Sequence, residues 1–362
     1  MNITTEDILT TLQTVIDPNT GADYISQKSV QNLQVEGSRV SLDVLLGYPA
    51  ASQHERIQKQ IEDALKKSCP DIREVVCHVR SQIIAHQVQK GLELLPQVKN
   101  IIAVASGKGG VGKSTTAANL ALALHAEGAN VGILDADIYG PSQAMMMGVD
   151  GRPESNDGKT MEPLENHGVQ VMSIGLLVDA DNALIWRGPM ATQALQQMLV
   201  QTNWKALDYL IVDMPPGTGD IALTLAQKVP ITGAVIVTTP QDIALLDAQR
   251  GFKMFEQVGI AVLGIIENMA VHICSNCGHA EHIFGEGGAQ RMSQKYDIPY
   301  LGGLPLTLAI REQADAGTPT VVHAPQSPEA KAYRAIALKI AAEIALRPRD
   351  YSAIMPKVKV TS

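Results

Sequence analysis

The chain has 362 residues, of which 45% are hydrophobic and 18% are charged, and its formal net charge is −8. This length predicts roughly two domains of about 150 residues each. The composition is typical of globular proteins and not of disordered ones. The negative charge argues against a general nucleic-acid binder, because such proteins present excess lysine and arginine to the phosphate backbone.

No apolar run has the length of a membrane span. The segment 1–7 lacks the basic and apolar regions of a secretory signal. Only four cysteines occur in the chain, which suits a reducing compartment better than a disulfide framework. We therefore expect a cytoplasmic protein without membrane or nucleic-acid partners.

The first part of the chain predicts a small α+β domain over residues 1–95. Apolar and polar residues alternate over 39–46 and again over 74–80, as in half-buried strands. Between them, apolar residues recur at helical spacing over 52–67, and Pro70 ends that helix. The domain contains no set of residues with obvious chemistry.

After Pro96, apolar runs suited to fully buried strands alternate with helical stretches. This alternation predicts an α/β domain over residues 96–348, with a mostly parallel sheet and helices on both faces, followed by a polar tail over 349–362. Ligands of such sheets bind at the carboxyl ends of the strands. The expected strands are 101–105, 131–134, 169–174, 209–212, 234–238, 262–266 and 300–304.

A phosphate-binding motif follows the first of these strands. The residues Gly107-Lys108-Gly109-Gly110-Val111-Gly112-Lys113-Ser114 match G-x-x-x-x-G-K-[ST] and precede the helical run 115–126. Glycines let backbone N–H groups face phosphates, and the helix N-terminus adds a favourable dipole. The motif predicts a P-loop NTPase sheet, in which Lys113 contacts the β- and γ-phosphates and Ser114 ligates Mg²⁺.

Two further strand ends carry carboxylates, which phosphoryl transfer needs to hold a metal ion and to orient water. Asp213 is expected to hold Mg²⁺, directly or through water, and Gly217 lets a backbone N–H approach the γ-phosphate. Asp135 and Asp137 alternate along the chain and are expected to point the same way, so only one of them need act.

The chain lacks the N-K-x-D motif by which GTPases commonly recognise guanine. Asn268 follows the expected strand 262–266, and its side-chain amide can both donate to and accept from an adenine edge. We therefore expect ATP to be preferred over GTP.

Cys274 and Cys277 form a Cys-x-x-Cys pair whose spacing suits metal-binding thiolates. One pair fills only half of a four-ligand site, and three alternatives are open. They are a zinc site completed by His279 and His282, a thioredoxin-like redox pair, and a cluster shared across a two-fold axis. The other cysteines, Cys69 and Cys77, are expected to be a helix-end residue and a strand core residue.

The segment from Gly107 to Thr115 resembles the deviant Walker A motif of the ParA/MinD/nitrogenase-iron-protein class. The resemblance implies a nucleotide-dependent homodimer in which Lys108 reaches the partner's nucleotide. It also implies that Asp137 is the switch I residue near the attacking water, that Asp213 lies in switch II, and that Asn268 reads adenine.

The chain from about residue 100 to 348 closely resembles the Mrp/ApbC family of iron–sulfur cluster carrier ATPases. The family implies a slow ATP-hydrolysing homodimer that holds a 4Fe–4S cluster on Cys274 and Cys277 of both chains. Such carriers take clusters from donor proteins and pass them to apo-proteins. The matching segments are 107–114, 135–142, 186–189, 213–220, 267–269, 274–279 and 283–285.

The N-terminal domain resembles the small domain often fused ahead of this ATPase, through residues 16–18 and its strand–helix order. Relatives often carry a reactive cysteine before the helix, whereas the stretch 47–53 contains none. The departure implies partner binding or support of the fold instead of cluster handling.

Two other classes remain for comparison: a ParA/MinD-like positioning ATPase, and an electron-transfer reductase like the nitrogenase iron protein. MinD-like proteins end in a membrane-binding amphipathic helix. Here an apolar helical stripe is followed by Pro348 and a polar tail, so we expect the stripe to pack against the sheet. The stripe consists of Tyr333, Ile336, Ile340 and Ile344.

Overall fold

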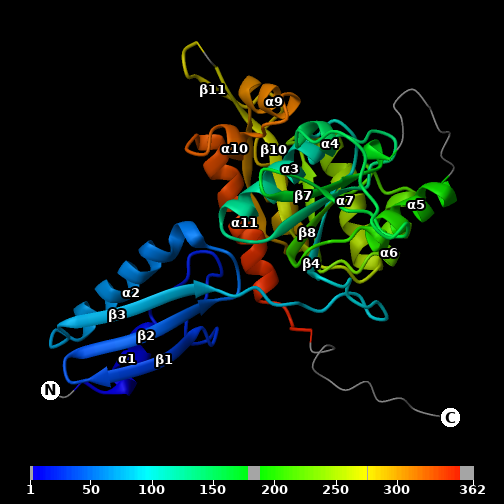
Figure 1. Ribbon diagram of the computed structural model, residues 1–362. Helices are drawn as coiled ribbons and strands as arrows, with labels where there is room; N and C mark the ends of the chain where they lie inside the picture. The colour runs from blue at the N-terminus through cyan, green and yellow to red at the C-terminus, as the bar shows by residue number, and fades with distance from the viewer. Residues whose placement is uncertain (1–2, 178–187, 275, 351–362) are drawn as a thin grey trace.

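The computed structural model describes residues 3–177, 188–274 and 276–350. Within these ranges the chain forms a three-stranded sheet near the N-terminus and a nine-stranded sheet in the remainder (Figure 1). Part of the expected motif at 186–189 and most of the expected polar tail lie outside the described residues. No helix of the described residues is long and apolar enough to cross a membrane.

The small sheet has the order β1-β2-β3, with an antiparallel first pair and a parallel second pair. The alternation predicted for β2 is observed, and α2 buries Ile57, Ile61 and Leu65 against the sheet. A Thr4–Asp7 capping box begins α1, a start signal that the sequence analysis did not use. The elements are α1 (Thr5–Leu12), β1 (Val30–Glu36), β2 (Arg39–Leu46), the 3-10 turn η1 (Ala51–Gln53), α2 (His54–Ser68) and β3 (Glu74–Ser81).

The large sheet has the order β11-β10-β9-β4-β8-β5-β7-β6, and β12 pairs with β10. All pairs are parallel except those of β6 and β11, which confirms a mostly parallel sheet. The seven predicted strands are all present. The strands are β4 (Val98–Ser106), β5 (Val131–Asp135), β6 (Leu164–Asn166), β7 (Val169–Ser173), β8 (Leu207–Asp213), β9 (Gly233–Thr238), β10 (Val262–Ile273), β11 (Ala280–Glu281) and β12 (Tyr300–Leu306).

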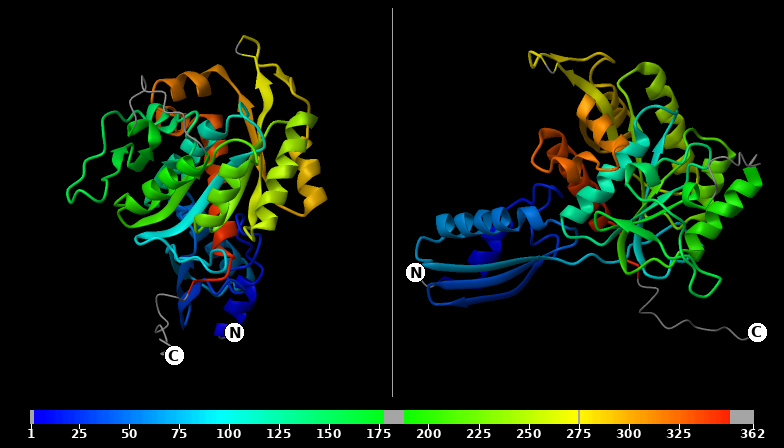
Figure 2. Two further views of the ribbon diagram at one scale, coloured as in Figure 1. Left: turned by 90° about the vertical axis from the view of Figure 1, so that its right-hand side faces the viewer. Right: turned by 45° about the horizontal axis from the view of Figure 1, so that its top comes forward.

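Helices cover both faces of this sheet, as expected (Figures 1 and 2). Alternate residues of β4 belong to different hydrophobic clusters: Ile102 and Val104 pack on the face of α3, whereas Ile101 and Ala103 pack with α5 and α6. The helices are α3 (Lys113–Ala126), α4 (Gln143–Met146), α5 (Gly188–Gln201), α6 (Asp220–Lys228), α7 (Asp242–Gln257), α8 (Gly288–Tyr296), α9 (Leu308–Asp315), α10 (Thr320–His323) and α11 (Pro328–Ala345), with a 3-10 turn η2 (Ile174–Leu176).

The final helix of the described residues, α11, is part of the core. It packs on α3 and β12, and its stripe residues Tyr333, Ile336, Ile340 and Ile344 are each at most 2% exposed. The expected packing against the sheet is therefore confirmed.

The two sheets are joined by residues 82–97, which include the domain boundary expected at residue 95. The N-terminal domain also contacts the larger domain through the loop before α2. The Ser52 hydroxyl and backbone N–H donate to the Glu127 carboxylate over 2.8 and 3.0 Å. Arg334 of α11 donates to the same carboxylate through Nε and Nη2, over 2.9 and 2.7 Å. Glu127 is the C-cap of α3, so this contact ties the N-terminal domain to the end of the P-loop helix.

The loop that carries Ser52 is held within its own domain by a second buried carboxylate. Tyr48 donates its hydroxyl proton to Asp17, with both carboxylate oxygens 2.8 Å away. Asn19 links this group to Gln53 through a hydrogen bond of 2.8 Å. The stretch 47–53 is therefore a structural connection between the domains.

We predict that Arg334→Met lowers the free energy of unfolding by about 3 kcal/mol, because removing one partner leaves a buried charge uncompensated. The Glu127 side chain is 1% exposed, and that of Arg334 is 22% exposed. Urea unfolding followed by circular dichroism measures the change. As a control, Arg311→Met removes two ion pairs of a side chain that is 61% exposed, and should change stability by no more than about 0.5 kcal/mol. Equal unfolding midpoints for both variants would contradict a stabilising role for the buried Arg334–Glu127 ion pair.

Candidate functional site

The P-loop connects β4 to α3 at the carboxyl edge of the large sheet. Gly112 is the N-cap of α3 and has φ of 81°, a left-handed conformation that favours glycine. Gly107 lies against the backbone of α7, where a Cβ atom would overlap Asp247 and Ala248. The loop therefore needs glycine at both positions, at one for its backbone angles and at the other for close packing.

Asn268 of β10 contacts the P-loop directly. Its side-chain Nδ2 donates to the carbonyl oxygen of Val111 over 2.8 Å, and a Cβ atom on Gly112 would overlap this amide. The sequence analysis expected this amide to donate to and accept from adenine. In the structure the loop uses one of the two N–H groups of this amide, so the other N–H and the carbonyl oxygen are the groups left for a base.

Lys113 and two carboxylates converge at the start of α3. Lys113 Nζ lies 2.5 Å from Asp213 Oδ1 and 3.9 Å from Asp137 Oδ2. The Lys113 side chain is 6% exposed and that of Asp213 is fully buried. Burial raises the pKa of Asp137, and the nearby Lys113 partly offsets this rise. The structure thus brings together a buried cation and the carboxylates expected at two different strand ends.

Strand order explains this convergence. β8 lies between β4 and β5, and Asp213 is in register with Val104 on one side and with Asp135 on the other. Burial and the neighbouring Asp213 raise the pKa of Asp135 to about 7. The sequence left open whether Asp135 or Asp137 acts. Of these two carboxylates, only Asp137 forms an ion pair with Lys113 among the described residues.

Asp135 instead holds the loop that follows β5. Its carboxylate accepts the backbone N–H groups of Asp137, Ser142 and Gln143 over 3.1, 2.8 and 2.9 Å. The Ser173 hydroxyl also donates to it over 3.1 Å. These bonds fix the path of the chain from Asp137 to the start of α4.

The sequence analysis missed Gln143, which is fully buried in this site. Its Nε2 donates to Asp213 Oδ2 over 2.8 Å and to the Ser114 carbonyl oxygen over 3.0 Å. The available signal was its position, directly after the motif 135–142. A polar residue at the start of a short helix gives no other indication of such contacts.

Two expected site residues have local contacts of their own. The Gly217 N–H donates to the carbonyl oxygen of Ser106 over 2.9 Å, so contact with a phosphate would replace this bond. Lys108 is half-buried, and its side chain forms no ion pair in the described ranges. Its backbone carbonyl accepts from the Ser106 hydroxyl over 2.9 Å.

The oxygen-rich donor set next to the P-loop fits Mg²⁺, which prefers carboxylates, hydroxyls and water. Lys113 donates to the Ser114 hydroxyl over 3.2 Å and also to the Asp213 carboxylate. Ser114 and Asp213, the two candidate Mg²⁺ ligands, are therefore both in contact with Lys113. Gln143 contacts both residues through Nε2, and its Oε1 is buried without a hydrogen-bond partner. An unpaired buried acceptor is costly, so a donor such as metal-bound water suits this position.

The cysteine pair lies at the end of β10, beyond Asn268. β10 and β11 form a short antiparallel hairpin, which projects at the top of Figure 1, away from the N-terminal domain. Hydrogen bonds from the backbone of Cys277 and Asn276 lower the pKa of Cys274, which favours the metal-binding thiolate. Cys277 is exposed and Cys274 is half-buried.

Of the two histidines of the zinc alternative, His282 has other contacts. His282 Nδ1 lies 2.8 Å from the carbonyl oxygen of Ala270, and its Nε2 lies 3.8 Å from Glu286. Among the described residues no group of three or more His, Cys, Asp or Glu side chains is placed to hold a metal ion. Cys69 and Cys77 pack against the core of the N-terminal domain, and burial raises the pKa of Cys77 to about 12.

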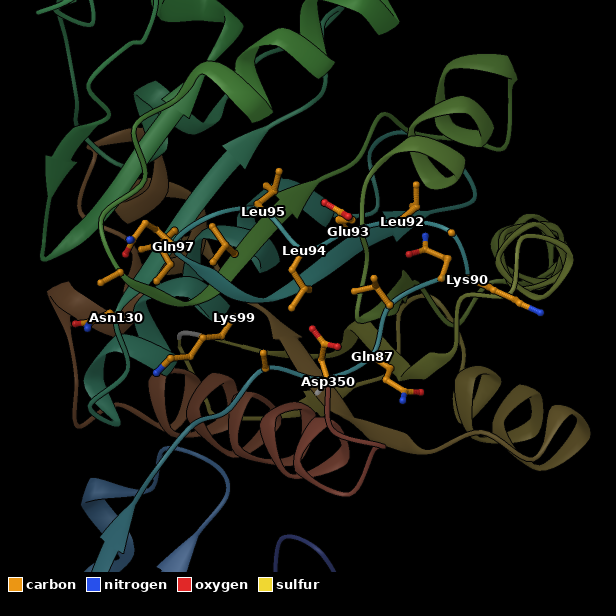
Figure 3. Close-up of a pocket in the computed structure, with 17 residues that line it drawn as sticks. Gln87, Lys90, Leu92, Glu93, Leu94, Leu95, Gln97, Lys99, Asn130 and Asp350 are labelled. Atoms are coloured by element: carbon orange, nitrogen blue, oxygen red, sulfur yellow. The ribbon is translucent and has the colours of Figure 1, made fainter. Parts of the chain in front are cut away.

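Two cavities lie at opposite edges of the large sheet. One of about 840 Å³ adjoins Cys274 between β10, α8 and α9. The other, of about 980 Å³, lies at the opposite edge, below the amino ends of β4 and β8 (Figure 3). It is lined mainly by the segment between the domains, and Lys99 at its rim is paired with Asp208 over 2.7 Å. Neither the P-loop nor the cysteine pair lines this second cavity.

The fold and the loop define a P-loop nucleotide-binding protein. A nucleotide-binding protein from Archaeoglobus fulgidus in complex with ADP shares 38% identity, with a TM-score of 0.57 over 65% of this chain and 91% of that chain. The cell division ATPase MinD of Pyrococcus furiosus shares 26% identity, with a TM-score of 0.53 over 67% of this chain and 98% of that one.

The chain belongs to the NUBPL iron-transfer P-loop NTPase family, which it matches over residues 97–341. Residues 5–77 match the iron–sulfur cluster assembly protein family. An iron–sulfur cluster carrier protein of Pseudomonas fragi is 61% identical over 71% of this chain and 90% of its own length. An iron–sulfur cluster carrier protein of Haemophilus influenzae is 50% identical over 90% of this chain and 88% of its own length. The iron–sulfur cluster transfer protein NUBPL of Mus musculus is 50% identical over 74% of this chain and 83% of its own length.

We predict that Gly112→Ala destabilises the P-loop by at least about 1–2 kcal/mol, the cost of a left-handed non-glycine residue, because its methyl group also displaces Asn268. ADP affinity should fall with it, as measured by isothermal titration calorimetry. Gly109→Ala is the control in the same loop, since a Cβ atom there meets nothing within 4 Å. Equal ADP affinities for the two variants would refute this account of the loop.

Proposed function

We propose that this protein is an ATP-hydrolysing iron–sulfur cluster carrier that holds a 4Fe–4S cluster between two copies of the chain. One observation carries the proposal: the strand β10 contacts the P-loop through Asn268 and ends at Ile273, directly before Cys274. The nucleotide loop and the thiol pair are therefore joined by a single strand. The iron–sulfur carrier relatives support the same function.

ATP binding requires an exchange of partners at Lys113. The ammonium group now neutralises Asp213, and a γ-phosphate supplies a stronger anionic partner at the same place. Asp213 is then released to hold Mg²⁺ together with the Ser114 hydroxyl. When bound, Mg²⁺ supplies positive charge to the phosphate oxygens as negative charge develops on them. Asp137 lies beside Lys113 and is placed to orient the attacking water.

The remaining nucleotide contacts come from backbone and amide groups. The P-loop from Gly107 to Thr115 surrounds the phosphates, and Gly217 contributes a backbone N–H once its bond to Ser106 is exchanged. Asn268 favours ATP over GTP, because its free carbonyl oxygen can accept from the 6-amino group of adenine.

A homodimer completes both sites. Cys274 and Cys277 supply two thiolates per chain, whereas a 4Fe–4S cluster takes four, and a two-fold axis doubles the pair. The half-buried Lys108 acts on the partner's nucleotide in the same dimer. The clusters are cargo that arrives from donor proteins in the cytoplasm and leaves for apo-proteins.

We predict that Lys113→Ala lowers ATP hydrolysis at least about a hundredfold, comparable with the loss of a preorganised electrostatic contact. Lys108→Ala should also lose hydrolysis while retaining nucleotide binding. Mixed dimers of the two variants should regain activity, because one composite site then contains both lysines. Phosphate release from verified mixed dimers provides the measurement. If those dimers are as inactive as each variant alone, Lys108 does not act in trans.

We predict that Cys274→Ala and Cys277→Ala each abolish the brown colour and the bound iron after anaerobic reconstitution. Because both chains of the dimer carry the substitution, either variant loses two cluster ligands per dimer. Wild-type protein should bind about four irons per dimer, as determined by iron and acid-labile sulfide analysis. Cys69→Ala and Cys77→Ala are controls that should retain the cluster, and all four variants should hydrolyse ATP. Stoichiometric zinc in wild-type protein that accepts neither iron nor sulfide would overturn the carrier function and favour a zinc site.

A further inference from the structure

Gln143 connects the two residues to which the proposed function assigns Mg²⁺. Its Nε2 is within hydrogen-bond distance of Asp213 Oδ2 and of the Ser114 backbone carbonyl, and its backbone N–H donates to Asp135. The side chain is completely buried. Its contacts therefore join the loop after β5 to the P-loop and to the end of β8.

The orientation of this amide is determined by its neighbours. Both groups that face Nε2 are acceptors, a carboxylate and a carbonyl, so only the nitrogen can occupy that place. The oxygen Oε1 must then point elsewhere, and it is buried without a hydrogen-bond partner. Leaving a buried acceptor unpaired carries a desolvation cost, which a bound donor removes.

We propose that Gln143 is a positioning residue for Mg²⁺. Its Nε2 keeps the Asp213 carboxylate oriented when Lys113 transfers from Asp213 to the γ-phosphate, since the two groups bind different oxygens of that carboxylate. Its Oε1 is the acceptor for a water molecule of the Mg²⁺ shell. The proposal rests on the proposed function, because it presumes Mg²⁺–nucleotide binding at Ser114 and Asp213.

The hydrogen bond between Gln143 and Asp213 bears on how Asp213 is held before and after nucleotide binding. Lys113 and Gln143 both hold Asp213 in this structure. In the proposal, Gln143 alone keeps its bond to Asp213 once nucleotide binds. Loss of Gln143 should therefore affect the Mg²⁺-dependent part of nucleotide binding, whereas contacts between the P-loop backbone and the phosphates should persist. This separates a positioning role from a general structural one.

The test uses Gln143→Leu and Gln143→Met, which retain the approximate size of the side chain and lack its hydrogen bonds. The affinity of the full chain for a non-hydrolysable ATP analogue, which retains a γ-phosphate group, is measured by calorimetry in EDTA and over a series of MgCl₂ concentrations. We expect the Mg²⁺ concentration for half-maximal effect to rise about tenfold or more, the scale of a lost hydrogen bond to a charged group. Affinity in EDTA should change less than about threefold, and high Mg²⁺ should restore wild-type affinity.

The matched control is Gln170→Leu on β7, which removes two side-chain hydrogen bonds to Lys205 far from the P-loop. It should leave the Mg²⁺ dependence unchanged. An unchanged Mg²⁺ dependence in both Gln143 variants would overturn the positioning role alone, and so would an equal loss of affinity in EDTA and in Mg²⁺. If wild-type affinity is itself independent of Mg²⁺, the magnesium–ATP site of the proposed function fails, and this proposal fails with it.

Discussion

The buried pairing of Lys113 with Asp213 is the interaction on which the candidate nucleotide site depends. An ammonium group that is almost fully buried needs a charged partner, and the Asp213 carboxylate at the end of β8 supplies it. The same carboxylate binds Gln143 through its other oxygen, while Asp137 lies slightly farther from the lysine. One ammonium group thus faces two carboxylates, and a phosphate bound by the loop has to compete with them for it.

The strand β10 links this charge set to the thiols. Its lower part is buried between β9 and β12, and its upper part continues to the hairpin that carries Cys274. Met269 has φ of 56°, and the pairing with β12 shifts between Glu267 and Val271, so the strand is irregular directly after Asn268. A change in the P-loop contact of Asn268 would therefore act at the point where the regular sheet gives way to the hairpin.

The helix α3 makes the corresponding connection in the opposite direction. It begins at the P-loop and ends at Glu127, whose buried carboxylate binds both Ser52 of the N-terminal domain and Arg334 of α11. This arrangement is favoured because displacement of Ser52 removes two hydrogen bonds from the buried carboxylate, and displacement of Arg334 removes its counter-charge. The N-terminal domain thus contributes to the structure that surrounds the end of the P-loop helix.

The sequence by itself determined the mostly parallel sheet, the P-loop and the cysteine pair, because hydrophobic period, glycine spacing and thiol spacing are local features of the chain. It also predicted that Asp213 and one of Asp135 and Asp137 lie near the phosphates, since all three lie at strand ends, and the resemblance to the ParA/MinD class singled out Asp137. Tertiary structure alone decided that β8 lies between β4 and β5, which places Gln143 between Ser114 and Asp213. Such contacts join residues far apart in sequence and depend on strand order, which no local pattern encodes.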